Sequence, residues 1–483
     1  MFPSIQDLMC IAPELVLCAA GVLIMVLDPF LVTGPAAGRG GGRRVADVLA
    51  LLGSAGALAS VYFPMTHQGV AFGGLLRIDA FSVFLHFIVC SIALLVALGA
   101  PSYLDREGLA HGEFFALVLF ATVGMGVMAS AQELITGFVA LEVSSISSYI
   151  LAGYRRDSKI SDEAAMKYFL LGSFASAFFL YGIALVYGAS GTTILPRVDA
   201  SLMNGTLLTL GLALIFVGLG FKVAAAPFQL WTPDVYEGAP APVTAMMSTG
   251  PKAAAFALFL RILMVVAHAG NIWFWVIWIS AVLTMFMGNL AAIEQTSVKR
   301  MLGYSSIAHA GYILVAFAAR NEIGTAAVLF YLAAYALMKV GAFTTVAWLG
   351  GTGERYLDLD DYAGLAHSRP VTAACLSIFL LSLLGLPVTA GFLGKFYIFD
   401  AALRSHLVWL AVLLAINSVI GAYYYLRVIV AMYMREPKRT FSNEKIPAGV
   451  AAVLTLAVAG TIYLGLFPNR IMDLAAQAAA MLH

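Results

Sequence analysis

The chain has 483 residues, 61% of them hydrophobic and 11% charged, with a formal net charge of +1 at pH 7. Its mean hydropathy is +0.92. Soluble domains carry about 25% charged residues, so this composition excludes a soluble enzyme, and the balanced charge gives no reason to expect a nucleic-acid partner. The sequence predicts an all-α polytopic membrane protein.

About fourteen membrane-spanning helices are expected, because apolar runs of roughly 20 residues, the length that crosses a bilayer core, recur along the chain with short polar breaks. The residues predicted to span the membrane are, in chain order, 10–32, 45–64, 79–100, 114–130, 134–153, 163–188, 206–231, 242–266, 272–293, 301–318, 323–349, 371–402, 406–434 and 446–467.

Two of these spans are predicted to be broken at a proline. Pro227 follows Lys222 in the seventh span, and Pro387 precedes Lys395 in the twelfth. Proline removes a backbone hydrogen bond, and the freed carbonyls need protein or water partners inside a membrane. Broken helices at matching positions of two halves are typical of a transporter site near the membrane midplane.

The basic residues predict the orientation. Loops after odd-numbered spans carry fifteen lysines and arginines, Arg155 and Lys299 among them, whereas loops after even-numbered spans and the C-terminal tail carry five. Positively charged loops stay on the cytoplasmic side. Both termini are therefore expected outside, which is the periplasm for a protein of the bacterial inner membrane.

The cysteines give no sign of a cofactor site. Cys10, Cys18, Cys90 and Cys375 lie in apolar segments without CxxC spacing, so neither a disulfide framework nor a metal or iron–sulfur site is indicated. A glycine pattern for nucleotide binding is also absent. Redox chemistry is expected in other chains.

Lysines are concentrated inside the predicted spans. Five of the nine lie there, namely Lys167, Lys222, Lys252, Lys339 and Lys395, against two of eighteen arginines, Arg261 and Arg427. These two arginines lie near span ends and are expected to reach the membrane surface. A buried lysine can lose its proton, whereas arginine effectively cannot. The preference for lysine over arginine inside the spans therefore predicts that these lysines take part in proton transfer.

Lys222 and Lys252 are the strongest candidates. Glu142 lies in mid-span within FVALEVSSISSYILAG; near Lys222 it would hold the amine protonated, and its withdrawal would release the proton. Lys252 follows Ser248 and Thr244 at helical spacing, a polar stripe that could line a water-filled cavity.

The other candidates keep a structural alternative. Lys339 can be a hydrogen-bond donor to carbonyls, Lys167 can reach the membrane surface as an end-of-span lysine, and His309 can be a proton relay or a packing residue. His86 is expected to pack. The acidic residues near span ends, Glu133, Asp162, Glu163 and Asp234, are expected to be solvated or to cap helices.

Two segments carry a resemblance to a known family. LEVSSISSYILAGYRRDSKISDEAAMKYFLLGSFASAFFLYGIALVYGASGTT and GFKVAAAPFQLWTPDVYEGAPAPVTAMMSTGPKAAAFALFLR resemble the subunit N family, one of the antiporter-like subunit families of bacterial NADH:quinone oxidoreductase, respiratory complex I. The similarity extends over essentially the whole chain. YRRD followed by EAAMKYFLLG is particular to this family, and APFxxWxPDxYEGAPxPV is shared by all antiporter-like subunits.

The resemblance implies two inverted five-helix repeats, spans 4–8 and 9–13, with helices 7 and 12 broken at Pro227 and near Pro387. The corresponding divisions are an N-terminal three-helix segment at 1–113, repeats at 114–266 and 267–434, and a C-terminal helix at 435–483. It also implies that FMN, iron–sulfur clusters and quinone belong to other subunits, and that the partners are neighbouring membrane-arm subunits, other antiporter-like ones included, and the lipid bilayer.

The family's roles carry over to matching residues. Glu142 is implied to modulate Lys222, Lys252 to be the central relay, and Lys395 to be the last residue before the outward exit. Lys167 matches a further family lysine, with Lys339 and His309 as intermediates. The chain departs from the family at Gln229, where histidine is common; glutamine cannot titrate, so water or a lysine is expected to bridge there.

Three alternatives remain open: a subunit of a multi-chain cation/proton antiporter, a structural subunit with relic lysines, and a subunit of the related ferredoxin-driven photosynthetic complex. The interior lysines also outnumber Glu142, the one clear interior carboxylate, and Asp400 lies about 140° around the helix from Lys395. An acidic residue of a neighbouring subunit is therefore predicted to approach Lys395.

Overall fold

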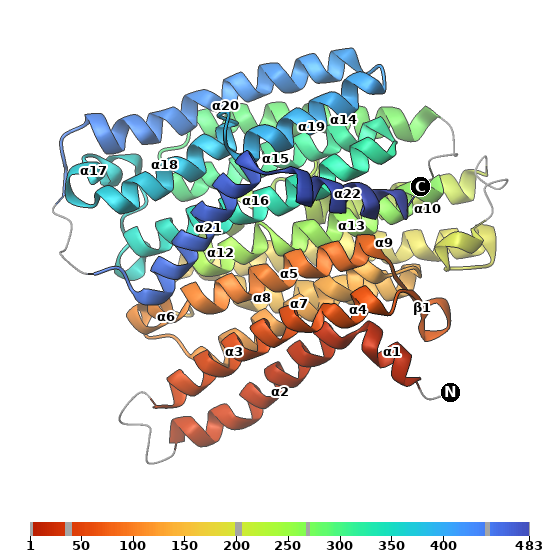
Figure 1. Cartoon of the computed structure of the whole chain (residues 1–483), viewed down its shortest axis with the longest axis horizontal. Helices are drawn as coiled ribbons and strands as arrows, with labels where there is room; N and C mark the ends of the chain where they lie inside the picture. Colours follow the sequence, from red (N-terminus) through yellow and green to blue (C-terminus); the bar gives the residue numbers. More distant parts are fainter. Residues whose placement is uncertain (1–2, 34–40, 199–204, 267–270, 440–444, 483) are drawn as a thin grey trace.

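The computed structural model describes residues 3–33, 41–198, 205–266, 271–439 and 445–482. Within this described part, thirteen helices are long and apolar enough to cross a membrane. The predicted twelfth span is the exception, because it is divided into two shorter helices. Together they account for the fourteen predicted crossings, and the helices lie side by side with both termini toward the same end (Figure 1).

The N-terminal part consists of helices and one short hairpin. Its elements are α1 (Ile5–Cys10), α2 (Ala12–Thr33), α3 (Gly41–Ser60), α4 (Tyr62–Thr66), β1 (Gly69–Ala71), η2 (Phe72–Gly74), β2 (Leu76–Ile78), α5 (Ala80–Gly99) and α6 (Pro101–Glu107). Strands β1 and β2 pair antiparallel, and the turn between them uses Gly73 and Gly74 at φ of 67° and 104°, a left-handed backbone that glycine adopts without strain. The sequence analysis did not anticipate this hairpin.

The next eight elements contain the first broken helix. They are α7 (His111–Ser130), α8 (Leu134–Ala152), α9 (Lys159–Ser190), η3 (Leu195–Arg197), α10 (Thr206–Val223), α11 (Trp231–Gly238), α12 (Ala241–Met247) and α13 (Gly250–Val266). Glu133 caps α8, since its carboxylate accepts hydrogen bonds from the N–H groups of Ile135 and Thr136 at 3.0 and 2.6 Å. The capping role predicted for Glu133 is thus confirmed.

The remaining elements contain the second broken helix. They are α14 (Asn271–Ile293), α15 (Val298–Ala319), α16 (Glu322–Leu349), η5 (Thr352–Glu354), η6 (Leu359–Tyr362), α17 (Leu365–Ser368), α18 (Pro370–Leu384), α19 (Ala390–Arg404), α20 (Val408–Met434), α21 (Ala448–Leu466) and α22 (Asn469–Ala480). The predicted last span thus corresponds to α21, and a further helix follows it.

Both breaks occur where the prolines predict them. Around Pro227, α10 ends at Val223 and α11 begins at Trp231. The backbone groups freed at Ala226 find partners on α14: its N–H donates to Thr284 Oγ1 at 2.8 Å, and its carbonyl accepts from Ser280 Oγ at 2.9 Å. The break is therefore stabilised by protein hydroxyls within the membrane.

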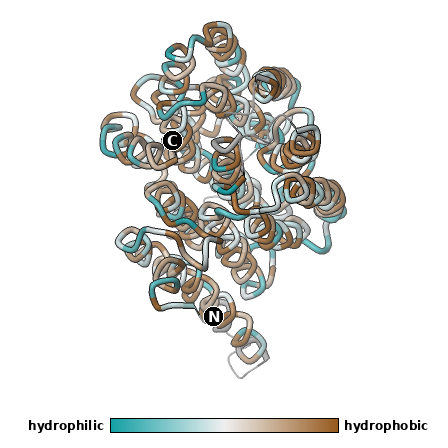
Figure 2. Tube along the Cα trace, turned by 90° about the vertical axis from the view of Figure 1, so that its right-hand side faces the viewer, coloured by the Kyte–Doolittle hydropathy of each residue, from teal (hydrophilic) through white to brown (hydrophobic). Residues whose placement is uncertain are grey.

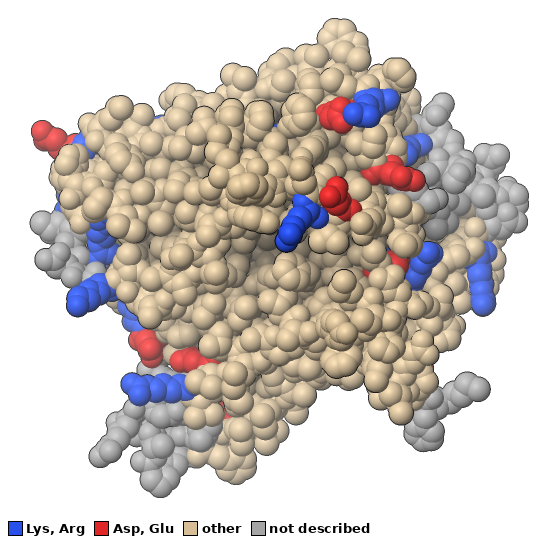
Figure 3. Space-filling model, in the orientation of Figure 1, with Lys and Arg blue, Asp and Glu red and all other residues tan. Residues whose placement is uncertain are grey.

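Two of the candidate lysines, Lys252 and Lys339, belong to helices at the centre of the bundle. The most apolar windows of the α12–α13 span, α15 and α16 are 100%, 94% and 89% buried, whereas those of α2, α9 and α21 are 28%, 33% and 33% buried. Seen along the helices, hydrophobic residues dominate the trace and hydrophilic stretches lie mostly in connecting loops (Figure 2). On the face drawn in Figure 3, most charged side chains gather toward the two ends, as expected of a surface in contact with lipid.

Candidate functional site

Lys222 is buried in the last turn of α10, directly before the break. Its Nζ donates hydrogen bonds to Ser145 Oγ on α8 at 2.8 Å and to Tyr168 OH on α9 at 3.1 Å. Tyr168 is in turn stacked on Trp231 at the start of α11, with 4.5 Å between ring centroids. Hydroxyls of α8 and α9 thus hold Lys222, and the Tyr168 ring connects it to the second half of the broken helix.

Glu142 lies one helical turn before Ser145 on α8 and accepts a hydrogen bond from Ser176 on α9. No ion pair among the described residues joins Glu142 to Lys222. Lys222 instead binds Ser145, which also donates to Leu141 O at 2.6 Å. The carboxylate and the amine are neighbours that do not touch in this arrangement.

Lys252 is buried at the start of α13 and reaches across to α15. Its Nζ donates to the carbonyl and hydroxyl of Ser306 at 2.9 and 2.5 Å, and Tyr335 OH donates to the same hydroxyl at 2.7 Å. Among the described residues, Ser248 and Thr244 of the predicted polar stripe make no hydrogen bond to Lys252, and their hydroxyls donate to main-chain carbonyls of α11, of α12 and of the turn between them.

Lys339 on α16 donates to Leu302 O and to Ser305 Oγ of α15 at 2.7 and 2.9 Å. Ser305 is hydrogen-bonded to Tyr425 OH at 2.5 Å, and this hydroxyl lies 3.0 Å from Nε2 of His309. Lys339 thus has the carbonyl contact expected of a structural hydrogen-bond donor. It also contacts a hydroxyl that is connected to His309.

The imidazole of His309 is hydrogen-bonded on both sides, because its Nδ1 contacts Tyr331 OH. A chain of side-chain hydrogen bonds therefore runs from Lys339 through Ser305, Tyr425 and His309 to Tyr331. His309 is part of a polar network and is not only a packing residue.

Lys395 is buried near the start of α19, and its Nζ donates to Leu384 O, the last carbonyl of α18, at 2.9 Å. The amine also lies 4.8 Å from the centroid of the Tyr312 ring. Asp400 pairs with Arg404 at 2.9 Å, and no ion pair among the described residues includes Lys395.

Lys167 differs from the other four lysines. Its side chain is 41% exposed and pairs with Glu163 at 2.7 Å and Asp234 at 2.8 Å. Asp234 also pairs with Arg300 of α15 at 2.8 Å. Lys167 therefore reaches the protein surface, which was the structural alternative for this residue. There it is part of a network of ion pairs along α9, α11 and α15.

Gln229 lies buried in the first break. Its Nε2 contacts Met287 Sδ at 3.2 Å, and its Oε1 has no hydrogen-bond partner within the described part of the chain. A buried acceptor of this kind costs free energy unless it is satisfied. The expected bridge by water or a lysine stays a prediction, and among the described residues no lysine donates to this oxygen.

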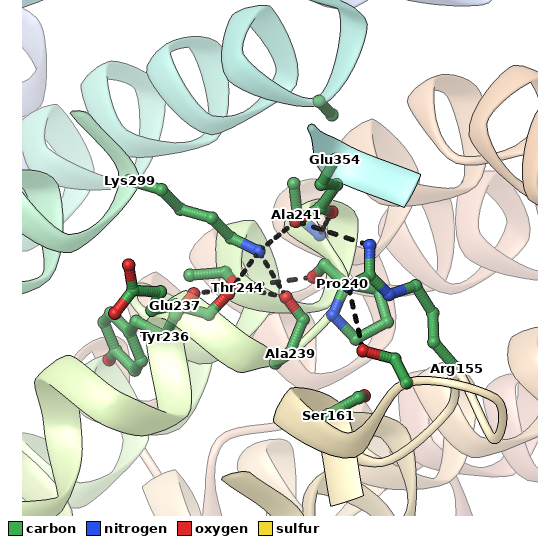
Figure 4. Close-up of polar contacts among 12 residues, drawn as sticks. Arg155, Ser161, Tyr236, Glu237, Ala239, Pro240, Ala241, Thr244, Lys299 and Glu354 are labelled. Atoms are coloured by element: carbon green, nitrogen blue, oxygen red, sulfur yellow. Dashed lines mark hydrogen bonds and ion pairs between the residues drawn. The ribbon is translucent and has the colours of Figure 1, made fainter. Parts of the chain in front are cut away.

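The sequence analysis missed a buried cluster of ion pairs. Lys299, counted in the sequence as a loop residue, has a fully buried side chain that pairs with Glu354 at 2.5 Å, and Arg155 Nη1 lies 3.8 Å from the same carboxylate (Figure 4). Burial alone would raise the pKa of the Glu354 carboxyl, but Lys299 and Arg155 hold that pKa below its usual value. Starting the tenth span at 298 instead of 301 would have placed Lys299 inside it.

Two more buried pairs correct the sequence analysis. His86 Nε2 lies 2.5 Å from Glu14 Oε1, so His86 does more than pack. Arg261 binds Asp79 with two hydrogen bonds of 3.1 and 2.8 Å, so it does not reach the membrane surface. Glu142, which is half-buried, is therefore not the one interior carboxylate. Hydropathy cannot reveal such pairs, because the partners are far apart in sequence.

Among the described residues, His, Cys, Asp and Glu side chains form no group of three or more that could hold a metal ion. The cysteines are free thiols in four separate places. The candidate lysines converge in this part of the chain with hydroxyls and an imidazole, groups that can exchange protons.

Comparison with known proteins identifies the family. Residues 131–421 match the family described as NADH:quinone oxidoreductase/Mrp antiporter, transmembrane region. This chain belongs to that family. NADH-quinone oxidoreductase subunit N 1 of Solibacter usitatus is a family relative that is 48% identical over 99% of this chain and 98% of its own length. The resemblance seen in the sequence is thereby confirmed.

Solved structures of the family have the same fold. A chain of respiratory complex I from Thermus thermophilus with bound aureothin is 36% identical and superposes with a TM-score of 0.80 over 96% of this chain and 99% of that chain. A chain of the Mrp complex from Dietzia sp. superposes with a TM-score of 0.87 over 99% and 98%, at 23% identity, which speaks to the fold alone. The prediction of an antiporter-like polytopic membrane protein is confirmed.

Proposed function

We propose that this chain is subunit N of NADH:quinone oxidoreductase and translocates protons in the membrane arm while quinone is reduced elsewhere in the complex. The observation that carries the proposal is the series of four buried lysines, Lys222, Lys252, Lys339 and Lys395, each of which donates to neutral hydroxyl or carbonyl oxygens. The full-length identity of 48% to a subunit N supports it.

The proposed path starts at Glu142. A change in the surroundings of this carboxylate, driven by quinone reduction, alters its attraction for the Lys222 ammonium. Lys222 then gives up its proton toward Lys252, and the charge passes onward through Lys339 and His309 to Lys395, near the outward exit. Moving one charge across about 100 mV costs about 2.3 kcal/mol, which modest changes in charge pairing can supply.

Hydroxyls supply the connections along much of this path. Ser306 joins Lys252 to Tyr335, and the neighbouring Ser305 joins Lys339 to the Tyr425–His309 pair. A hydroxyl can donate one proton and accept another at the same time. A proton can therefore pass through these side chains without a carboxylate at each step.

The proposal includes the surroundings of the chain. FMN, iron–sulfur clusters and quinone belong to other subunits of the complex, and the partners are neighbouring membrane-arm subunits, other antiporter-like ones included, and the lipid bilayer. The location is the bacterial inner membrane with both termini in the periplasm, which the distribution of Lys and Arg among the loops supports.

The chain divides, in this proposal, into an N-terminal segment (1–113), two inverted repeats (114–266 and 267–434) and a C-terminal segment (435–483). The two breaks support the division, since one falls in each repeat and each has a buried lysine beside it. Such pairs of broken helices are typical of inverted-repeat transporters.

Replacement of Lys222 tests the function. Membrane vesicles with Lys222→Ala in the assembled complex are expected to lose most NADH-driven proton pumping, with a parallel fall in NADH:quinone electron transfer, because the two processes are coupled. Assembly is checked by native electrophoresis. Wild-type rates of both processes would disprove a role for the buried amine and favour a structural subunit.

A multi-chain cation/proton antiporter is the alternative function, because the matching family also includes Mrp antiporters. Purification of the tagged chain separates the two. Subunit N is expected to bring NADH dehydrogenase activity with it, whereas an antiporter subunit would be isolated without that activity and would restore sodium tolerance to a strain that lacks its own antiporters.

A further inference from the structure

The turn between α11 and α12 connects the two principal lysines of the proposed path. Lys222 lies just before the first break, α11 is the second half of that broken helix, and α12 leads directly into α13 with Lys252. The turn itself is Ala239–Pro240. Any shift of this turn changes the placement of one lysine relative to the other.

Two buried charges hold the turn from opposite sides. Lys299 Nζ donates to Glu237 O at 3.0 Å and to Ala239 O at 2.5 Å, at the C-terminal end of α11. Glu354 Oε1 accepts from the N–H of Ala241, the first residue of α12, at 2.8 Å. The cation therefore meets carbonyls at the end of α11, and the anion meets the first N–H of α12, main-chain groups that have no partner within either helix.

The same pair connects the turn to the rest of the path. Lys299 is the second residue of α15, the helix that carries Ser305 and Ser306. Glu354 follows the end of α16 and accepts a hydrogen bond from Tyr103 OH of α6 at 2.7 Å. Figure 4 shows Lys299 and Arg155 approaching the turn from opposite sides with Glu354 between them.

We propose that Lys299 and Glu354 are positioning residues for proton transfer, which hold the α11–α12 turn against α15 and so fix the geometry between Lys222 and the Lys252–Ser306 pair. This inference rests on the proposed function. Neither residue touches the transferred proton. Their effect passes through the two helix ends, where they meet main-chain groups that water cannot reach.

Glu354→Gln is the first test, because it removes the charge and keeps the size of the side chain. Asp360→Asn is the matched control: Asp360 lies in the same loop between α16 and α18, but its ion pairs with Lys438 and Arg435 are at the surface. Each variant is made in the complete complex. Assembly, proton pumping and the ratio of pumping rates in H2O and D2O are measured in vesicles.

Glu354→Gln is expected to slow pumping by about tenfold, which is within the roughly 100-fold loss that a misplacement of about 1 Å can cause. The H2O/D2O ratio of pumping rates is expected to rise, because proton transfer becomes rate-limiting. Asp360→Asn is expected to match wild type in both. An assembled Glu354→Gln complex with wild-type pumping and isotope ratio would overturn the inference.

Tyr103→Phe keeps the inference testable if Glu354→Gln does not assemble. It removes one hydrogen bond to the carboxylate and leaves the Lys299 pair intact. A raised isotope ratio in the assembled Tyr103→Phe complex supports the inference, and a wild-type ratio contradicts it. A merely structural role for the cluster would lower the amount of complex and leave the ratio unchanged.

The double variant Lys299→Glu with Glu354→Lys tests the helix-end argument. It keeps two opposite charges but places the carboxylate against the α11 carbonyls and the ammonium against the α12 N–H. No recovery beyond Glu354→Gln is expected, and wild-type pumping would show that the order of the charges is irrelevant. If Lys222→Ala stops pumping while Glu354→Gln does not alter it, this inference alone fails; if Lys222→Ala pumps normally, the proposed function fails first.

Discussion

The buried amines of Lys222, Lys252, Lys339 and Lys395 have neutral hydrogen-bond partners. Lys222 meets two hydroxyls, Lys252 a hydroxyl and a carbonyl, and Lys395 a carbonyl. A carboxylate in contact would hold the ammonium charge in place, as Glu354 does for Lys299. The chain thus contains two kinds of buried lysine: those fixed by an ion pair and those that can exchange a proton.

Ser306→Ala should slow pumping more than a comparable serine replacement elsewhere. Its hydroxyl joins Lys252 to Tyr335, so alanine interrupts that connection, and a fall of about tenfold is expected, since a general acid–base group contributes about 100-fold or more. Ser377→Ala is the control, because Ser377 is also buried but donates only to Ala373 O of its own helix. Equal rates in the two variants would mean that protons bypass Ser306.

Glu354 predicts a pH dependence of stability. Its folded pKa lies below the ordinary value of 4.5, so its contribution is fully present above about pH 4.5 and is lost as the pH falls through the folded pKa. Breaking a buried pair costs about 3–5 kcal/mol. The Tm of Glu354→Gln in detergent should therefore be well below that of wild type at pH 7, and the gap should shrink in acid. A gap that stays constant as the pH falls would contradict a charged Glu354.

At the scale of elements, the broken helices depend on their neighbours. The first break is supported by α14 through Ser280 and Thr284, and the second is closed by the Lys395 amine and by Ser382 Oγ, which accepts from the N–H of Gly391 at 3.1 Å. Proline explains why a helix stops at these places. The side chains on other helices explain why the stop is tolerated inside a membrane.

Thr284→Val is expected to destabilise the first break, because the N–H of Ala226 then loses its acceptor. An unsatisfied buried donor costs about 1–3 kcal/mol, which should appear as a lower Tm of the purified protein. Thr345→Val is the matched control, since Thr345 is equally buried but only donates to Gly341 O within α16. If both variants unfold at the wild-type temperature, the break does not depend on Thr284.

The breaks and the buried lysines could be predicted from the sequence, because proline and an isolated amine in an apolar run act locally and are visible in a short window. The ion pairs Lys299–Glu354 and Glu14–His86 could not, since each joins residues that only the folded chain brings together. The partner of Lys252 could not be predicted either: its sequence neighbours Thr244 and Ser248 indicate a polar helix face, but the hydroxyl that Lys252 contacts comes from α15.

At the scale of the whole molecule, the candidate path ends at a residue without a charged partner in the described chain. Lys395 is buried, yet Asp400, the carboxylate nearest to it in the sequence, forms an ion pair with Arg404. We therefore expect an acidic side chain of a neighbouring subunit within a few ångströms of Lys395 in the assembled complex. A structure of that complex with no carboxylate near Lys395 would remove this prediction.

The adjacency of Ser305 and Ser306 has a consequence for timing. Ser306 binds Lys252 and Ser305 binds Lys339, and consecutive residues of a helix point about 100° apart. Since both hydroxyls are fixed to one rigid helix, a rotation of α15 that brings one closer to its lysine must move the other at the same instant. A movement of α15 would therefore change the contacts of Lys252 and Lys339 together, so that one helix couples the two lysines.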